Sequence, residues 1–134
     1  MRCIALLIAS LFSSLSYAGA YSYSCEINGE YKFGSDGQLV PDDRKIYLGQ
    51  QFNVERKSGV VLGAGVGNSS YLTKTVIDIG GKEQAYKLIW ISKEVVGTNG
   101  GRNAVYLSVE EYSESDVKPF SMIVGSQVLS GVCQ

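Results

Sequence analysis

The sequence predicts an all-β protein, a small antiparallel barrel or flattened sandwich of about seven to eight strands. Apolar and polar residues alternate in several windows with the two-residue period of a half-buried strand. Glycine-containing segments separate these windows, and the chain has 16 glycines but only 2 prolines. No window shows the spacing of an amphipathic helix over three turns, so antiparallel strands joined by short turns are expected.

Residues 1–20 have the pattern of a secretory signal, and residues 21–134 are expected to form a single all-β domain. A positive amino terminus precedes an apolar stretch over residues 4–15, and small residues lead up to Ala20. We expect cleavage after Ala20, with cleavage after Ala18 as the alternative. The apolar stretch is shorter than the about 20 residues of a membrane-spanning helix, so no membrane insertion is expected after signal removal. The short signal is typical of bacteria, and the protein is expected to be secreted or periplasmic.

Eight segments have the alternation or the apolar content of strands. In chain order they are residues 21–27, 51–57, 60–63, 73–80, 84–96, 104–112, 120–125 and 127–133. The residues expected to share the core-facing side are Tyr21, Tyr23, Cys25, Ile27, Phe52, Val54, Tyr86, Leu88, Trp90, Val105, Leu107 and Val109. The last two segments are either separate strands or one long strand with a Gly-Ser bend. In residues 41–49, Pro41 suits the start of a single helical turn.

The mature chain keeps two of its cysteines, Cys25 near its start and Cys133 next to its last residue, because Cys3 lies in the signal. Two cysteines in an exported protein are typically oxidised to a disulfide. A Cys25–Cys133 bridge would join the first strand to the last. In the chain-entropy model, a loop that spans almost the whole domain corresponds to about 4 to 5 kcal/mol of stabilisation.

Other roles for Cys25 fit the sequence less well. A lipid-bearing cysteine directly follows its signal after a leucine and two small residues, whereas Tyr-Ser precedes Cys25. A catalytic thiol needs a base, usually histidine, and the chain has none. Two thiolates without histidine and without a Cys-x-x-Cys pair do not make a zinc site.

The composition argues against nucleic acid and anionic membranes as partners. The chain has 12 basic and 13 acidic side chains, and Arg2 leaves with the signal. The remaining basic residues are scattered, so no positive patch is expected. An apolar content of 45% is sufficient for a packed core and argues against disorder.

The absence of histidine makes an enzyme unexpected, because Ser-His and Cys-His catalysis and most catalytic zinc sites need that side chain. The neighbouring carboxylates Glu110 and Glu111 would point to opposite faces of a strand. Asp42 and Asp43 are expected to lie in a solvated turn. The glycine-rich segment from Gly63 precedes a strand rather than the helix of a phosphate-binding loop. We therefore expect no catalytic residue, cofactor or metal.

The candidate partner-binding surface is a Tyr/Ile face made of Ile89, Ile91, Tyr106 and Tyr112. These residues alternate with expected core residues and so would point outwards. Pairing of the two strands as a hairpin would set the isoleucines beside Tyr106. Tyrosine and aliphatic side chains of this kind are typical of protein interfaces. Alternatively, a sandwich that buries both faces of these strands would leave no exposed patch.

The mature chain begins with a Tyr-x-Cys motif at residues 23–25, ends with Cys133 and has about eight expected strands. In this layout it resembles the small bacterial periplasmic inhibitors of c-type lysozyme. Those inhibitors carry a Ser-Gly-x-x-Tyr signature, and the nearest match here, residues 58–62, has leucine in place of the tyrosine. The resemblance implies inhibition of a lysozyme as a function.

Two functions are therefore expected as alternatives. The first is an exported non-enzymatic binding or structural module of the bacterial envelope, which contacts a protein partner or a second copy of itself through the Tyr/Ile face. The second is a secreted or periplasmic inhibitor of an extracellular enzyme such as a lysozyme. An inhibitor inserts a rigid loop into the cleft of its target, whereas a binding module pairs through a face or a sheet edge.

Overall fold

The computed structural model describes residues 21–63, 65, 72–92 and 104–134. Within these residues the protein is all-β, with strands and no helix, as the sequence predicted. The strands are β1 (Ser22–Phe33), β2 (Leu39–Pro41), β3 (Gln51–Glu55), β4 (Val61–Gly63), β5 (Leu72–Gly81), β6 (Gln84–Ser92), β7 (Ala104–Val109), β8 (Lys118–Val124) and β9 (Gln127–Cys133). The expected signal at residues 1–20 lies outside the described residues, as does almost all of the glycine-rich segment that follows Gly63.

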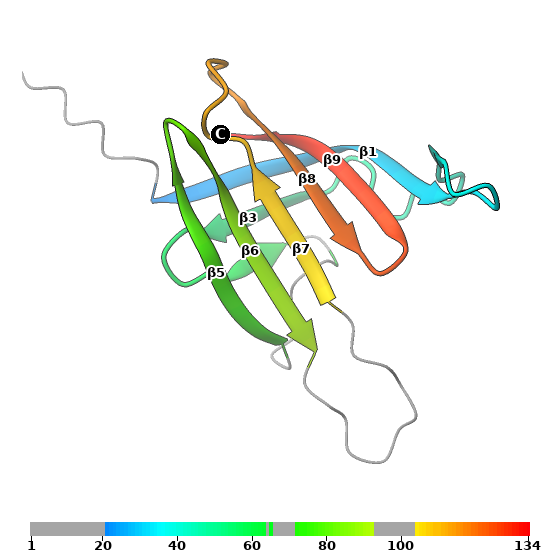
Figure 1. Ribbon diagram of the computed structural model, residues 1–134, viewed down its shortest axis with the longest axis horizontal. Helices are drawn as coiled ribbons and strands as arrows, with labels where there is room; N and C mark the ends of the chain where they lie inside the picture. Colours follow the sequence, from blue (N-terminus) through cyan, green and yellow to red (C-terminus); the bar gives the residue numbers. More distant parts are fainter. Residues whose placement is uncertain (1–20, 64, 66–71, 93–103) are drawn as a thin grey trace, which may run out of the picture.

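The strands form one curled antiparallel sheet, an open half-barrel, in the order β4-β3-β1-β9-β8-β7-β6-β5. Strand β2 pairs with β1 off this path. Figure 1 shows β5 to β9 side by side, with β1 and β3 crossing behind them. Strands β4 and β5 end the sheet, and among the described residues no backbone pairing joins them. The expected antiparallel sheet is confirmed, in an open form.

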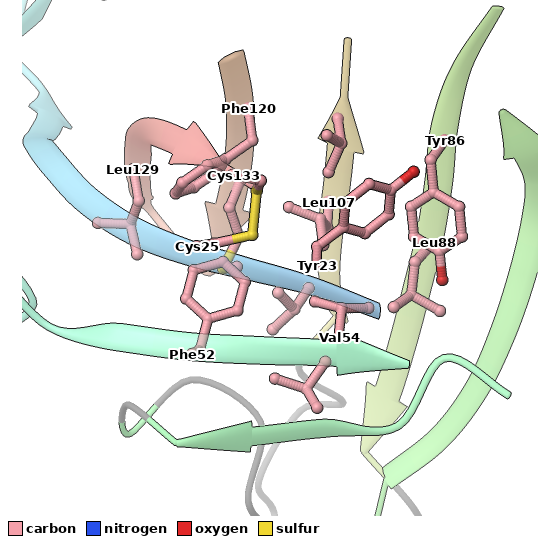
Figure 2. Packing of buried hydrophobic residues seen from close by; sticks show 14 of the residues in the cluster. Tyr23, Cys25, Phe52, Val54, Tyr86, Leu88, Leu107, Phe120, Leu129 and Cys133 are labelled. Carbon is pink, nitrogen blue, oxygen red and sulfur yellow. A yellow bond between two sulfur atoms is a disulfide. The ribbon is translucent and has the colours of Figure 1, made fainter. Parts of the chain in front are cut away.

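The curl of the sheet encloses a single hydrophobic core. Tyr23 of β1 packs against Tyr86 of β6 with ring centroids 5.2 Å apart, and Phe52 meets Phe120 edge-on at 5.3 Å (Figure 2). Every residue that the sequence assigned to the core is buried except Tyr21, which precedes β1 and is exposed. Further core residues come from the remaining strands: Val61, Phe120, Met122, Leu129 and Cys133.

Contact between the β3–β4 turn and β5 and β6 helps to close the open side of the half-barrel. Gly59 has a φ of +68°, in the left-handed region that favours glycine. A Cβ at this position would lie 2.5 Å from Cδ1 of Leu88 and 3.2 Å from Cγ2 of Val76. The turn therefore needs glycine for both its backbone conformation and its close approach to the opposite wall.

A bulge in β1 changes which of its side chains face inwards. The pairing of β1 with β9 shifts register between Ile27 and Gly29. Beyond the shift Glu30 pairs with the buried Leu129, and directly paired residues share a face. Glu30 therefore points inwards and Tyr31 outwards, so the bulge brings a carboxylate under the sheet.

The Cys25–Cys133 disulfide is present and joins the first strand to the last, as predicted. The two cysteines are directly opposite each other in the pairing of β1 with β9, and both are buried. Beside them, backbone hydrogen bonds link Ser24 and Gln134 in both directions, at 3.0 and 2.9 Å. In Figure 2 the bridge lies among the side chains of the core.

Three local features were uncertain or absent in the sequence prediction: the strands at the end of the chain, the segment after Pro41 and the short strand β2. The last two segments are separate strands, β8 and β9, joined through Gly125 with a φ of 59°. Residues 42–50 form turns and bends without a helical turn. The short strand β2 was not anticipated, because Leu39–Pro41 is too brief to show a period.

Replacing Cys25 or Cys133 with serine is expected to lower the free energy of unfolding by about 2 to 5 kcal/mol, because the unfolded chain loses a constraint on a very long loop. Urea denaturation of the wild type and each variant measures this. Thiol titration of the exported wild type under denaturing, non-reducing conditions should find no free sulfhydryl. Two titratable thiols, or variants as stable as the wild type, would contradict the prediction.

Candidate protein-binding face

An apolar row crosses the outer surface of four neighbouring strands. Ile89 of β6 pairs with Tyr106 of β7, Tyr106 pairs with Ile123 of β8, and Ile123 pairs with Val128 of β9. Each of these residues alternates with buried neighbours, so the row faces outwards. We call these four residues the outer row. The alignment of the outer row follows directly from the strand register.

The outer row is partly exposed to solvent. The exposed fraction of Ile123 is 43%, and the other three residues of the row are half-buried. Ile91, two residues along β6, has an exposed fraction of 38% and pairs with Ala104 on the same face. The described part of the chain therefore lays no second sheet over this surface, so the alternative of a sandwich that buries both strand faces does not hold here.

The row of residues beside the outer row is small and almost uncharged. Ser108, Ser121 and Ser130 are paired in sequence across β7, β8 and β9. Lys87 of β6 pairs with Ser108 and is the single charged residue of this row between β6 and β9. A surface with few charges and with short side chains beside aliphatic and aromatic ones has the composition of an interface core.

The structure brings three of the four expected site residues onto one surface. Ile89 and Tyr106 are direct neighbours, and Ile91 lies on the same face. Tyr112 is exposed but lies in the turn after β7, at the opposite end of that strand from Ala104. The alternation that placed Tyr112 on the face applies only within a strand, and β7 ends at Val109.

Ile123 and Val128 belong to the surface but were not identified from the sequence. The alternation of β8 indicates Ile123, because Phe120 and Met122 are buried and the residue that follows Met122 must point outwards. The uncertainty over one or two strands at the end of the chain obscured it. Once β8 and β9 are separate strands, their register places both residues beside Tyr106.

A polar cluster lies where β1, the β3–β4 turn and the end of β7 meet. The Tyr23 hydroxyl donates a hydrogen bond to Glu111, and the Arg56 guanidinium forms an ion pair with the same carboxylate at 2.7 Å. The Arg56 guanidinium also lies 5.2 Å from the centroid of the Tyr23 ring. Burial, and then the bond to Glu111, raise the pKa of Tyr23 far above its usual range. The cluster ties the walls of the half-barrel together.

Two buried polar atoms of β6 have no hydrogen-bond partner in the described structure: the hydroxyl oxygen of Tyr86 and Nε1 of Trp90. Burial raises the pKa of Tyr86 to about 12, with a smaller contribution from the nearby Glu55 carboxylate. Both side chains therefore act as apolar bodies in the core, and their polar groups do not contribute hydrogen bonds to stability.

The sequence suggested that Asp42 lies in a solvated turn, but the structure shows it buried. Its carboxylate is buried and accepts hydrogen bonds from Nε of Arg44 at 3.1 Å, from Nη2 of Arg44 at 2.7 Å and from Gln127 at 2.9 Å. The hydrogen bonds from Arg44 hold the pKa of Asp42 well below its usual range. Asp43, by contrast, is exposed as expected. The donor Gln127 is distant from Asp42 in sequence, so no local pattern connects the two residues.

Among the described residues no group of three or more His, Cys, Asp or Glu side chains is placed to hold a metal ion. Nor does the part of the chain that the structure describes contain a helix of the length and hydropathy needed to span a membrane.

No family model matches this chain, and no curated protein or solved structure matches it. The layout shared with lysozyme inhibitors therefore stays a resemblance, and function has to be argued from the residues themselves.

Substituting phenylalanine for the two core tyrosines, Tyr23 and Tyr86, should have different effects on stability. Tyr23→Phe removes a hydrogen bond to a charged group and should lower the free energy of unfolding by about 1.5 to 3 kcal/mol. Tyr86→Phe removes a buried hydroxyl without a partner and should be neutral or stabilise by about 1 kcal/mol. Chemical denaturation at neutral pH measures both. Equal destabilisation by the two changes would show that the Tyr86 hydroxyl has a partner.

The comparison of the wild type with Tyr86→Phe also predicts a pH dependence of the free energy of unfolding. Because the pKa of Tyr86 is raised to about 12 in the folded protein, its contribution to stability is intact below the pKa of about 10 of the unfolded chain. The contribution is lost as the pH rises from there towards 12. Stability of the wild type relative to Tyr86→Phe should therefore fall over this range and stay constant below it.

Proposed function

We propose that this protein is an exported, non-enzymatic binding or structural module of the bacterial envelope. It contacts a protein partner, or a second copy of the chain, through the surface formed by Ile89, Ile91, Tyr106 and Ile123. The observation that carries the proposal is the outer row, an apolar and nearly uncharged strip that the strand register sets across four strands. Tyrosine and aliphatic side chains on such a strip gain more from a protein surface than from water.

The disulfide supports the exported location. A buried bridge between the first and last strands persists in an oxidising compartment and is rare in the cytosol. The secretory pattern of residues 1–20 agrees with this placement. Secretion into the medium and retention in the periplasm both satisfy these observations.

A non-enzymatic role agrees with how the acidic side chains near the core are used. Asp42 is held by Arg44 and Gln127, and Glu111 by Arg56 and Tyr23. A general acid or base has to face its substrate with a free lone pair or proton. These two carboxylates instead hold separate parts of the chain together.

If the outer row is the centre of an interface, Tyr106→Ala should weaken binding at least about thirtyfold, since central aromatic anchors typically contribute about 2 kcal/mol or more. The partner is first captured from envelope and medium with residues 21–134 as bait. Affinity is then measured by calorimetry for wild type, Tyr106→Ala and Ile123→Ser. Lys82→Ala, in the exposed turn between β5 and β6, is the matched control and should bind like the wild type.

Self-association is tested in parallel by sedimentation equilibrium over a range of concentrations. Thermal melts of each variant separate lost binding from lost folding. If the wild type is monomeric and Tyr106→Ala binds the captured partner as tightly as the wild type, the proposed surface is wrong.

The alternative function, inhibition of an extracellular enzyme such as a lysozyme, draws support from the β3–β4 turn. The Glu55 carboxylate accepts hydrogen bonds from the backbone N–H groups of Lys57 and Ser58, at 3.2 and 2.6 Å. Gly59 anchors the turn against β6, while Lys57 and Ser58 are exposed. A rigid, exposed turn is what an inhibitor inserts into a cleft.

Under this alternative, the mature protein at equimolar concentration should slow lysis of bacterial cell walls by a c-type lysozyme, as measured by turbidity. Lys57→Ala, which changes only an exposed residue of the turn, should weaken inhibition at least about tenfold. Tyr106→Ala should leave it unchanged. Full lysis in the presence of excess protein would exclude this target.

A further inference from the structure

The surface that contains the outer row has a ridge and a trough. The ridge is the outer row itself, which carries the large side chains of this face on β6 to β9. The trough lies two residues away on each strand, and we call its residues the serine row: Lys87, Ser108, Ser121 and Ser130. Residues on the same face of one strand are about 7 Å apart when they are separated by two positions, so the two rows run parallel at this spacing.

Both rows lie on a surface that a partner can approach. Figure 1 shows β6 to β9 side by side, with β1 and β3 behind them, so the rows lie on the face that points away from these two strands. Ser121 and Ile123 are exposed, and the other members of both rows are half-buried. The one charged member, Lys87, lies at the border of the surface, where it pairs with Asp78 of β5 in the strand register. The centre of the surface is therefore uncharged.

A ridge beside a parallel trough of the same length is complementary to itself. A two-fold axis parallel to the rows and midway between them places the outer row of one copy over the serine row of the other. Each large side chain then meets a small one on the same strand of the other copy: Tyr106 over Ser108, Ile123 over Ser121 and Val128 over Ser130. A two-fold axis parallel to the strands would instead set the outer row against itself, large on large. The first arrangement interdigitates and the second does not.

The two edges of the sheet are poor sites for pairing with a second copy. Strand β4 at one end has only three residues. Strand β5 at the other end carries Lys74 and a bulge between Val76 and Asp78. Short edge strands, edge lysines and bulges all hinder edge-to-edge pairing. A second copy is therefore better accommodated by the face of β6 to β9 than by a sheet edge.

We propose that two copies of this chain associate face to face, with the outer row of each copy seated in the serine row of the other. This inference rests on the proposed function and narrows the partner to a second copy. The contact brings two uncharged centres together, so no unpaired charge is buried. At the border, the apolar stem of Lys87 covers Ile89 of the second copy, while its ammonium group stays on the side of Asp78. Trapped water satisfies the serine hydroxyls.

The size of the surface predicts a weak dimer. Four strands about 4.8 Å apart and three or four rows about 7 Å apart give roughly 400 to 500 Å² on each copy. Two such surfaces bury about 800 to 1,000 Å² in total, which is near the lower limit for a specific interface. We therefore expect a monomer–dimer equilibrium with a Kd on the order of 10 to 100 µM rather than a permanent dimer.

The test measures self-association of residues 21–134, with the disulfide intact, by sedimentation equilibrium. Ser121→Lys fills the trough and Ile123→Glu puts a charge on the ridge, so each variant alone should associate at least about tenfold more weakly than the wild type. In an equal mixture, the introduced lysine faces the introduced glutamate, and the second contact across the two-fold axis stays native. The mixture should therefore associate at least about tenfold more tightly than either variant alone. Leu62→Glu, at an exposed leucine of β4 outside this surface, is the matched control and should associate like the wild type.

Two results would overturn the inference. The first is a wild type that stays monomeric at about 1 mM. If Tyr106→Ala then still loses a captured partner, the proposed function stands and the second copy is the wrong partner, so the two failures are distinguishable. The second is a wild-type dimer whose variants do not complement each other in the mixture, because the copies would then meet in another way. If thermal melts show that either variant is unfolded, Ser108→Lys mixed with Tyr106→Glu makes the same comparison on β7.

Discussion

The structure depends on the pairing of β1 with β9, which the Cys25–Cys133 bridge fixes. On one side of this junction lie β1, β2, β3 and β4, and on the other β5 to β9 form a run of consecutive antiparallel neighbours. Within each part, strands pair with partners that are close in sequence. Among the described strands, the β1–β9 pairing is the one that joins the two parts into a single sheet, so the continuity of the half-barrel depends on it.

The length of β1 lets it serve both parts of the sheet. Its first half contributes Tyr23, Cys25 and Ile27 to the core, and its second half pairs with β2. The bulge between these halves reverses the inward and outward sides, which turns Glu30 under the sheet. A single extra residue in one strand thus accounts for the buried carboxylate.

The sequence predicted the features that depend on local alternation. Phe52, Leu88 and Leu107 are buried because each sits in a regular strand whose period can be read directly. The disulfide followed from the number of cysteines and the exported context, without geometry. Ile89 and Tyr106 were placed together by the assumption of a hairpin, which the register of β6 and β7 confirms.

Features that depend on contacts distant in sequence were missed. Asp42 resembled a solvated turn residue because its partner Gln127 lies at the other end of the chain. Glu111 binds Tyr23 and Arg56, which no local pattern connects. Tyr112 was misplaced for a different reason, since alternation was extended past the end of a strand. The boundaries of strands and the bulges within them set the limit of what periodicity can predict.

The position of the disulfide also decides how the domain carries load. Ser24 and Gln134 lie side by side just outside the bridge, so both ends of the domain leave it at one point. A pull on the two ends is therefore transmitted through a covalent bond and spares the strand pairs that follow Cys25, whereas the pairs of Ser22, Tyr23 and Ser24 with β3 lie before the bridge. A domain pulled at both ends in this way would keep its outer surfaces intact under tension that would unravel a domain without the bridge.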